Sequence, residues 1–243
     1  MKILFFNAGY CTGIKGTAFE YVTQFWKYLY SGRKVLRDLR NFLREVDPDV
    51  VALAEVDSGS ARGRFINQVE FLGRELKYGT HMIKRKYDRR RIIHTLPILR
   101  NQSNAILAKD GRIGFTSYYM RSGVKRLIIQ AQIQPDIDFF VVHLSLGKKV
   151  RVQQLRQLSR MITHSKKVIV AGDFNVFTGH DELTSFMKKH GLVSANRKHL
   201  PTFPSWRPVA ELDYFLVSPN IKVKKFKILN HALSDHLPIM IEI

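Results

Sequence analysis

The sequence is poor in cysteine and in acidic residues. Only Cys11 among the 243 residues is a cysteine, so no disulfide can form within the chain, and a zinc site built from several thiolates is excluded. Asp and Glu number 20 against 40 Lys and Arg, which gives a formal net charge of +20. A surface of this sign attracts polyanions, so we expect nucleic acid, an anionic lipid headgroup or a phosphorylated small molecule as a partner. No obligate protein partner is indicated.

Long apolar runs and low-complexity tracts are also absent. No run approaches the length of a transmembrane helix, and the apolar run Ile3–Phe6 ends too soon at Asn7 for a secretory signal. The sequence therefore predicts a cytoplasmic protein. No Pro-, Gly- or Ser-rich linker divides the chain, so residues 1–243 are expected to form one domain. The hydrophobic content of 45% is that of a globular protein.

Amphipathic stretches and short apolar runs interleave along the chain. They predict helices over residues 17–30, 34–46, 65–76, 150–163 and 181–190. Strands are predicted over 2–7, 50–55, 103–109, 112–120, 126–134, 138–144, 168–171, 212–218, 222–228 and 237–243. Several strands adjoin without an intervening helix, so the sheets must be mixed or largely antiparallel. The predicted fold class is α/β, with two sheets facing each other.

Polar side chains stand at the ends of many of these strands. They are Asn7, Glu55, Asn104, His143, Asp173, Asn175, Asp213, Asp235 and His236. Carboxylate and amide oxygens suit a hard cation such as Mg²⁺ or Mn²⁺. The histidines and remaining acids can move protons and stabilise developing negative charge. With the basic surface, this set predicts metal-assisted hydrolysis of a phosphate ester.

The order of these residues resembles that of the endonuclease/exonuclease/phosphatase superfamily, which includes the deoxyribonuclease I-like nucleases. The matching motifs are Asn7, Ala54–Val56, Ser103–Leu107, Val142–Leu144, Gly172–Asn175, Leu212–Ser218 and Ser234–His236. They span almost the whole chain. The resemblance implies a four-layer α-β-β-α sandwich of two mainly antiparallel sheets, with the site at their open edge.

The resemblance also implies a metal site. Glu55 is the expected main ligand of Mg²⁺, with Mn²⁺ as the alternative ion, and Asn7 and Asp235 are expected in or near the coordination shell. Many relatives carry an acid or an amide two residues after the first Asn, where this chain has Gly9. We therefore expect few metal contacts from the first loop.

The expected catalytic residues come from the same resemblance. Asp173 would orient or deprotonate the attacking water, and Asn175 would hold the phosphate. His236, with its tautomer set by Asp213, would contact the phosphate or act as general acid or base. His143 would donate to a phosphate oxygen or to the leaving group.

Basic residues interleaved with aromatic ones favour nucleic acid as the substrate. The basic groups are the run 84–91, expected to be a loop, then Lys148, Lys149 and Arg151, and finally Arg197, Lys198 and Arg207 beside Trp206. Asn104 and Arg126 match supporting positions of the superfamily and are expected to bind substrate.

We predict a phosphodiesterase or nuclease that acts on nucleic acid. One alternative is a phospholipid- or inositol-phosphate-type hydrolase, because Tyr21, Trp26 and Tyr28 in the helix predicted over 17–30 could form either a membrane-interface element or a core face. The other alternative is a catalytically silent member of the superfamily that binds nucleic acid.

Overall fold

The computed structural model describes residues 1–17, 20, 23, 32–86, 101–177 and 181–243. Most of the helix predicted over 17–30, including its three aromatic residues, lies outside the described residues. So does the part of the basic run from Tyr87 to Arg91.

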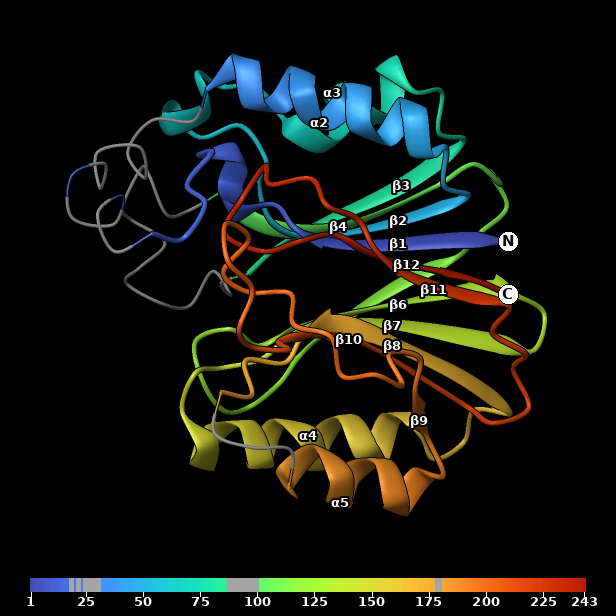
Figure 1. The fold of residues 1–243 in the computed structure, drawn as a ribbon. Coiled ribbons are helices and arrows are strands. Elements are labelled where there is room, and N and C mark those ends of the chain that lie inside the picture. Colours follow the sequence, from blue (N-terminus) through green and yellow to red (C-terminus); the bar gives the residue numbers. More distant parts are fainter. Residues whose placement is uncertain (18–19, 21–22, 24–31, 87–100, 178–180) are drawn as a thin grey trace.

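Within the described residues the strands form two sheets of six strands each. The sheets face each other, and helices cover the outer face of each (Figure 1). The first sheet has the order β11 (Lys225–Ile228), β12 (Ile239–Glu242), β1 (Lys2–Asn7), β2 (Val50–Asp57), β4 (Gln102–Ala108), β3 (Thr80–Arg85). The second has the order β5 (Phe115–Tyr119), β6 (Leu127–Gln134), β7 (Ile137–His143), β8 (Lys167–Asp173), β10 (Asp213–Val217), β9 (Val193–Ser194). Only β1 with β2 and β7 with β8 pair in parallel among the described strands. The predicted four-layer sandwich of mainly antiparallel sheets is confirmed.

The helices are amphipathic and bury one face on a sheet. Helices α2 (Arg33–Val46) and α3 (Gln68–Glu75) cover the first sheet, and α4 (Lys148–Ile162) and α5 (Asp181–His190) cover the second (Figure 1). Two short 3₁₀ turns, η1 (Gly9–Cys11) and η3 (Ala61–Gly63), follow β1 and β2. No helix within the described ranges combines the length and the apolar character needed to cross a membrane.

Three apolar layers hold the sandwich together. Along β1, Ile3 and Phe5 pack between the two sheets, whereas Leu4 and Phe6 pack under the helices. A strand that is buried on both faces reads as a continuous apolar run, because successive side chains point to opposite faces. This is the reason that the central strands are recognisable in the sequence.

Two strands were missed by the sequence prediction. The edge strand β3 pairs with β4 from Thr80 opposite Ala108 to Arg85 opposite Ser103, and the short β9 pairs with β10. The prediction of a loop over 84–91 is therefore wrong at its start, because Lys84 and Arg85 are strand residues. Strand β3 is half-exposed and mixes polar with apolar residues, so its sequence lacks a clear period of two.

Candidate active site

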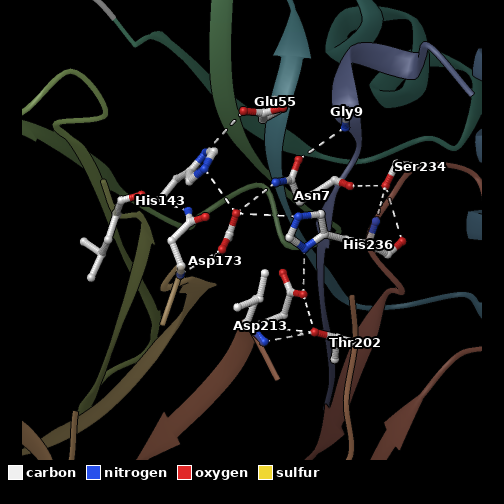
Figure 2. A network of polar contacts seen from close by, with 12 residues as sticks. Asn7, Gly9, Glu55, His143, Asp173, Thr202, Asp213, Ser234 and His236 are labelled. Carbon is white, nitrogen blue, oxygen red and sulfur yellow. Dashed lines mark hydrogen bonds and ion pairs between the residues drawn. The ribbon is translucent and has the colours of Figure 1, made fainter. Parts of the chain in front are cut away.

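The site lies where the core between the sheets gives way to polar side chains. Asn7, His143, Asp173 and Asp213 each continue, with a period of two, the series of apolar residues that their own strand directs between the sheets. They meet at the edge opposite the chain termini (Figures 1 and 2). All four are buried. The alternation that builds the core therefore also aims these side chains at one another.

Glu55 joins them through an irregularity in β2. The register between β2 and β4 shifts between Leu53 and Val56, and Glu55 has a φ of 54°. Its backbone N–H donates to Asn104 Oδ1 at 3.2 Å. A bulge of this kind redirects a side chain that strict alternation would place on the other face. Asn104, expected to bind substrate, thus contacts the backbone that carries Glu55.

Asp173 is the centre of the polar network shown in Figure 2. Its Oδ2 accepts from Asn7 Nδ2 at 3.1 Å and lies 3.2 Å from His143 Nε2 and 3.8 Å from His236 Nε2. Its Oδ1 accepts from the backbone N–H of Asn175 at 3.0 Å. Burial alone would raise the pKa of Asp173, but the two histidines outweigh it and hold the pKa well below its usual range. Asp173 is therefore an ionised, firmly oriented carboxylate.

His236 and Asp213 form a buried pair. His236 Nδ1 lies 2.8 Å from Asp213 Oδ2, which also accepts from Thr202 Oγ1 at 2.6 Å. Burial lowers the pKa of His236, but the carboxylates of Asp213 and Asp173 more than reverse this and raise it to about 10. His236 is thus an imidazolium at neutral pH. Its Nε2 faces Asp173, so a donor and an acceptor for protons lie side by side.

His143 is neutral, in contrast to the charged His236. Burial lowers its pKa to about 4, and the neighbouring ammonium groups of Lys125 and Lys86 act in the same direction. Its Nε2 contacts both Lys125 Nζ and Asp173 Oδ2, and its Nδ1 lies 3.8 Å from Glu55 Oε1. The site therefore combines a charged and a neutral imidazole, which is the division that acid–base chemistry needs.

Sequence reasoning missed Lys86, Lys125 and Tyr10. Lys86 Nζ donates to Glu55 Oε1 at 3.0 Å and to the Tyr10 hydroxyl at 2.8 Å, and Lys125 Nζ lies 3.9 Å from the same Glu55 oxygen. Burial alone would raise the pKa of Glu55, but these lysines lower it well below the usual range. Burial lowers the pKa of Lys86 to about 8. Lys86 lies in the basic run that we interpreted as a loop. No motif in the sequence pointed to Lys125 or Tyr10.

Tyr10 itself packs against a buried ion pair. Arg62 Nη2 lies 3.0 Å from Asp57 Oδ2, and the Arg62 guanidinium stacks 4.2 Å above the centre of the Tyr10 ring. The backbone carbonyl of Tyr10 accepts from Gln68 Nε2 at 3.1 Å. Both charged partners are almost fully buried. This cluster fixes the loop after β1 against the loop after β2.

The remaining predicted residues fall at the margin of this network. Asp235 is half-buried in the loop before β12 and packs against Gly9, which lies two residues after Asn7 on the first loop. Asn175 has a φ of 53° and donates from Nδ2 to the Leu144 carbonyl at 2.9 Å. Arg126 is half-buried immediately before β6, where its neighbour Lys125 reaches the centre of the site.

One basic residue does not border the site as expected. Arg151 is buried, and its guanidinium pairs with Glu182 and donates to the Ser145 carbonyl. The prediction that it faces substrate is wrong. A position inside the first turn of α4, facing α5, makes it a structural residue.

The oxygen donors present fit a hard divalent cation. Within the described part of the chain, the polar contacts of the Glu55 carboxylate all fall on Oε1, which leaves Oε2 available. Asn7 offers Oδ1, which among the described residues accepts only from the Gly9 N–H at 3.2 Å, and an amide oxygen has a second lone pair. Asn7, Glu55 and Asp235 come from β1, β2 and the approach to β12, which are neighbours in the first sheet.

A second acidic group lies on the opposite sheet. Oxygen and nitrogen atoms of Asp173, Asp213 and His236 lie within 4.8 Å of one another, the one such group among the described residues. Asp213 Oδ1 is buried and makes no hydrogen bond within those residues. An imidazolium cannot ligate a metal, so the charge of His236 favours a role in proton transfer or phosphate binding for this group.

Close packing between two strands explains the glycine at position 172, in the motif Gly-Asp-Phe-Asn. It lies opposite Val142 in the parallel pair of β7 and β8, and a Cβ there would come within 2.2 Å of the Val142 carbonyl oxygen. The close approach brings His143 and Asp173, the next pair in register, together at the ends of their strands. The glycine therefore serves the spacing of two site residues.

The two-sheet sandwich with acids, amides and histidines at one edge has the deoxyribonuclease I-like fold. The chain belongs to the Endonuclease/Exonuclease/phosphatase family, whose model matches residues 28–236. Members of this family are generally hydrolytic phosphoesterases. A comparison with curated protein sequences finds no match.

Solved structures share the fold at low sequence identity. The mannosyl-6-phosphatase Bt3783 of Bacteroides thetaiotaomicron is 15% identical with a TM-score of 0.70, over 100% of this chain and 98% of that one. The human Nocturnin catalytic domain with bound sulfate is 17% identical with a TM-score of 0.69, over 99% and 92%. TDP2 of D. rerio, complexed with a single-strand DNA product, is 15% identical with a TM-score of 0.65, over 99% and 97%. These structural matches establish the fold. At such low sequence identity they do not identify the substrate.

Proposed function

We propose that this protein is a Mg²⁺-dependent phosphodiesterase that acts on nucleic acid, built as one domain over residues 1–243 and acting in the cytoplasm. The observation that carries the proposal is the meeting of three groups from two sheets. These are the ionised Asp173, the charged His236 on Asp213, and the Glu55 carboxylate facing them. Metal-assisted phosphate-ester hydrolysis can use each of these three kinds of group, for metal binding, proton transfer and charge stabilisation.

Each side chain has a role that its contacts support. Glu55, with Asn7 and Asp235, would hold Mg²⁺, whose chemistry there is to neutralise charge on the phosphate. Asp173 would orient or deprotonate the attacking water, because its carboxylate is ionised and oriented by Asn7. His236 would donate to a phosphate oxygen from Nε2, since Asp213 holds its other nitrogen.

Other residues would position the phosphate and the leaving group. Asn175, turned inward by its left-handed backbone, would hold the phosphate beside Asp173. The neutral His143 would donate to a phosphate oxygen or to the leaving group from the opposite side. Arg126 would contribute to substrate binding at the margin, and Asn104 would position Glu55 by accepting from its backbone N–H.

The basic surface supports a nucleic-acid substrate. Lys148 and Lys149 are exposed at the start of α4, a few residues after the site end of β7. Arg207 and Trp206 are exposed on the loop whose Thr202 contacts Asp213. Cations beside an exposed aromatic side chain suit a phosphate backbone with base stacking.

A substrate panel tests the proposal. Hydrolysis is measured with Mg²⁺, with Mn²⁺ and with EDTA on plasmid DNA, single-stranded DNA, abasic DNA, RNA, bis-p-nitrophenyl phosphate, sphingomyelin, inositol phosphates and a sugar phosphate. We expect metal-dependent cleavage of a nucleic acid, lost in Asp173→Asn and in His236→Ala. Arg112→Ala, an exposed change on the surface between β4 and β5, is the control for net charge and folding.

The other outcomes are distinct. Preferred turnover of a lipid or small phosphoester would replace the nucleic-acid assignment with that substrate class. Salt-sensitive DNA binding without cleavage of any substrate would indicate a silent binding protein. Turnover that persists in EDTA, or in Asp173→Asn, would contradict the mechanism.

A further inference from the structure

Two ammonium groups share one oxygen of the carboxylate expected to bind metal. Lys86 Nζ lies 3.0 Å and Lys125 Nζ 3.9 Å from Glu55 Oε1. Lys86 comes from the end of β3 at the edge of the first sheet, and Lys125 from the turn before β6 in the second. Glu55 therefore has one ammonium group near it from each of the two sheets.

The two lysines are held differently. The Lys86 side chain is 2% exposed and is anchored by the Tyr10 hydroxyl, whose ring is fixed under the Arg62 guanidinium. The Lys125 side chain is 26% exposed and rests on His143 Nε2. Lys86 is thus a fixed charge, and Lys125 is one that can swing away.

These charges oppose the arrival of a cation. One carboxylate charge on Glu55 is offset by two ammonium charges, and like charges a few ångströms apart in a buried site repel strongly. A divalent ion that binds Glu55 must either displace the ammonium groups from Oε1 or lie beside them. Either event weakens its affinity.

We propose that Lys86 and Lys125 are resident counterions of Glu55 that compete with the divalent metal and set a low metal affinity in the absence of substrate. The inference rests on the proposed role of Glu55 as metal ligand. Both lysines are positioning residues here, acting on the metal through Glu55. A substrate phosphate would draw the mobile Lys125 to itself and so relieve part of the competition.

Calorimetric titration with Mn²⁺, without substrate, tests this in the full chain. We expect Lys125→Met and Lys86→Met each to bind Mn²⁺ at least about tenfold more tightly than the unmodified protein. Lys125→Arg, which keeps the charge, should remain weak. Lys166→Met removes an exposed lysine just before β8, at the end of that strand away from Asp173, and controls for the change in net charge.

The direction of the change makes the test sharp. A variant that merely disorders the site would bind Mn²⁺ less tightly, so a gain in affinity separates competition from structural support. Equal or weaker binding in both folded methionine variants, relative to Lys166→Met, would overturn the inference. Circular dichroism checks folding, and Lys125→Met alone decides the question if Lys86→Met does not fold.

The proposed function fails in a different way. Its failure would appear as hydrolysis without metal in the substrate panel, or as tight Mn²⁺ binding that survives Glu55→Gln. The lysine inference fails by itself, with the proposed function intact, when Glu55→Gln abolishes Mn²⁺ binding and the lysine variants do not improve it.

Discussion

His236 Nδ1 lies 2.8 Å from Asp213 Oδ2, and this contact joins the loop before β12 of the first sheet to β10 of the second. Both partners are buried, and Thr202 completes the pair from a third segment. The pair fixes which nitrogen of His236 faces Asp173 and keeps its imidazole charged. It therefore links the assembly of the two sheets to the chemistry proposed at their edge.

Asp213→Asn should reduce kcat by at least about a hundredfold, because the neutral amide no longer stabilises the imidazolium. Thr202→Val removes the hydrogen bond from Oγ1 to the Asp213 carboxylate, together with the two that Oγ1 accepts from the backbone N–H groups of Leu212 and Asp213, and should cost about tenfold or less. The measurement is kcat against pH on whichever panel substrate is cleaved. An Asp213→Asn enzyme with the unmodified kcat and pH profile would refute the role of the pair.

The pH dependence of stability should report the same pair. The folded pKa of His236, about 10, lies above the ordinary value of 6.5, so its stabilisation is complete below pH 6.5 and is lost as pH rises toward 10. From pH 6.5 to 8 this group should lower the free energy of unfolding by about 1–2 kcal/mol. Urea denaturation in EDTA measures it, and His236→Asn should remove this slope.

Two other groups limit the pH range in which the contribution of His236 to stability can be measured by itself. The pKa of Lys86 is lowered to about 8, so its titration raises stability with pH only above that value. The pKa of His143 is lowered to about 4, so it affects stability between about 4 and 6.5. A slope between pH 6.5 and 8 that is the same in His236→Asn would contradict the charge assigned to His236.

Gly172→Ala should destabilise the protein by about 3 kcal/mol or more, because the new Cβ meets the Val142 carbonyl in the middle of the sheet. Gly147→Ala is the matched control, since a Cβ there meets nothing within 4 Å. Chemical denaturation of both variants checks this. Wild-type stability in Gly172→Ala would show that β7 and β8 can separate without cost.

Asn104→Ala should act on metal binding more than on substrate binding. It removes the acceptor of the Glu55 N–H and should cost about 1–2 kcal/mol of stability. With the bulge loosened, the metal concentration needed for half-maximal activity should rise, while KM at saturating metal changes little. A large rise in KM with an unchanged metal requirement would instead assign Asn104 to substrate contact, as the family resemblance implies.

The sequence predicted the central strands and the ordered motifs well. Strands such as β1 and β8 are buried on both faces, so their apolar runs are continuous and end sharply at Asn7 and Asp173. The edge strand β3 was missed because one face meets solvent and its residues are mixed. Arg151 was grouped with the substrate-facing basic residues because no residue near it in the sequence indicates that it pairs with Glu182 of another helix.

The sequence by itself determined the sandwich, the family and the identity of the acids, amides and histidines at the strand ends. Local periodicity locates the strands, because a strand's neighbours along the chain decide which face each side chain takes. The order of the motifs, through the family resemblance, implies the family and the four-layer sandwich. Only the tertiary structure decided the charges within the site. The opposite shifts of His143 and His236, and the approach of Lys86 and Lys125 to Glu55, depend on burial and on distances between segments far apart in the chain.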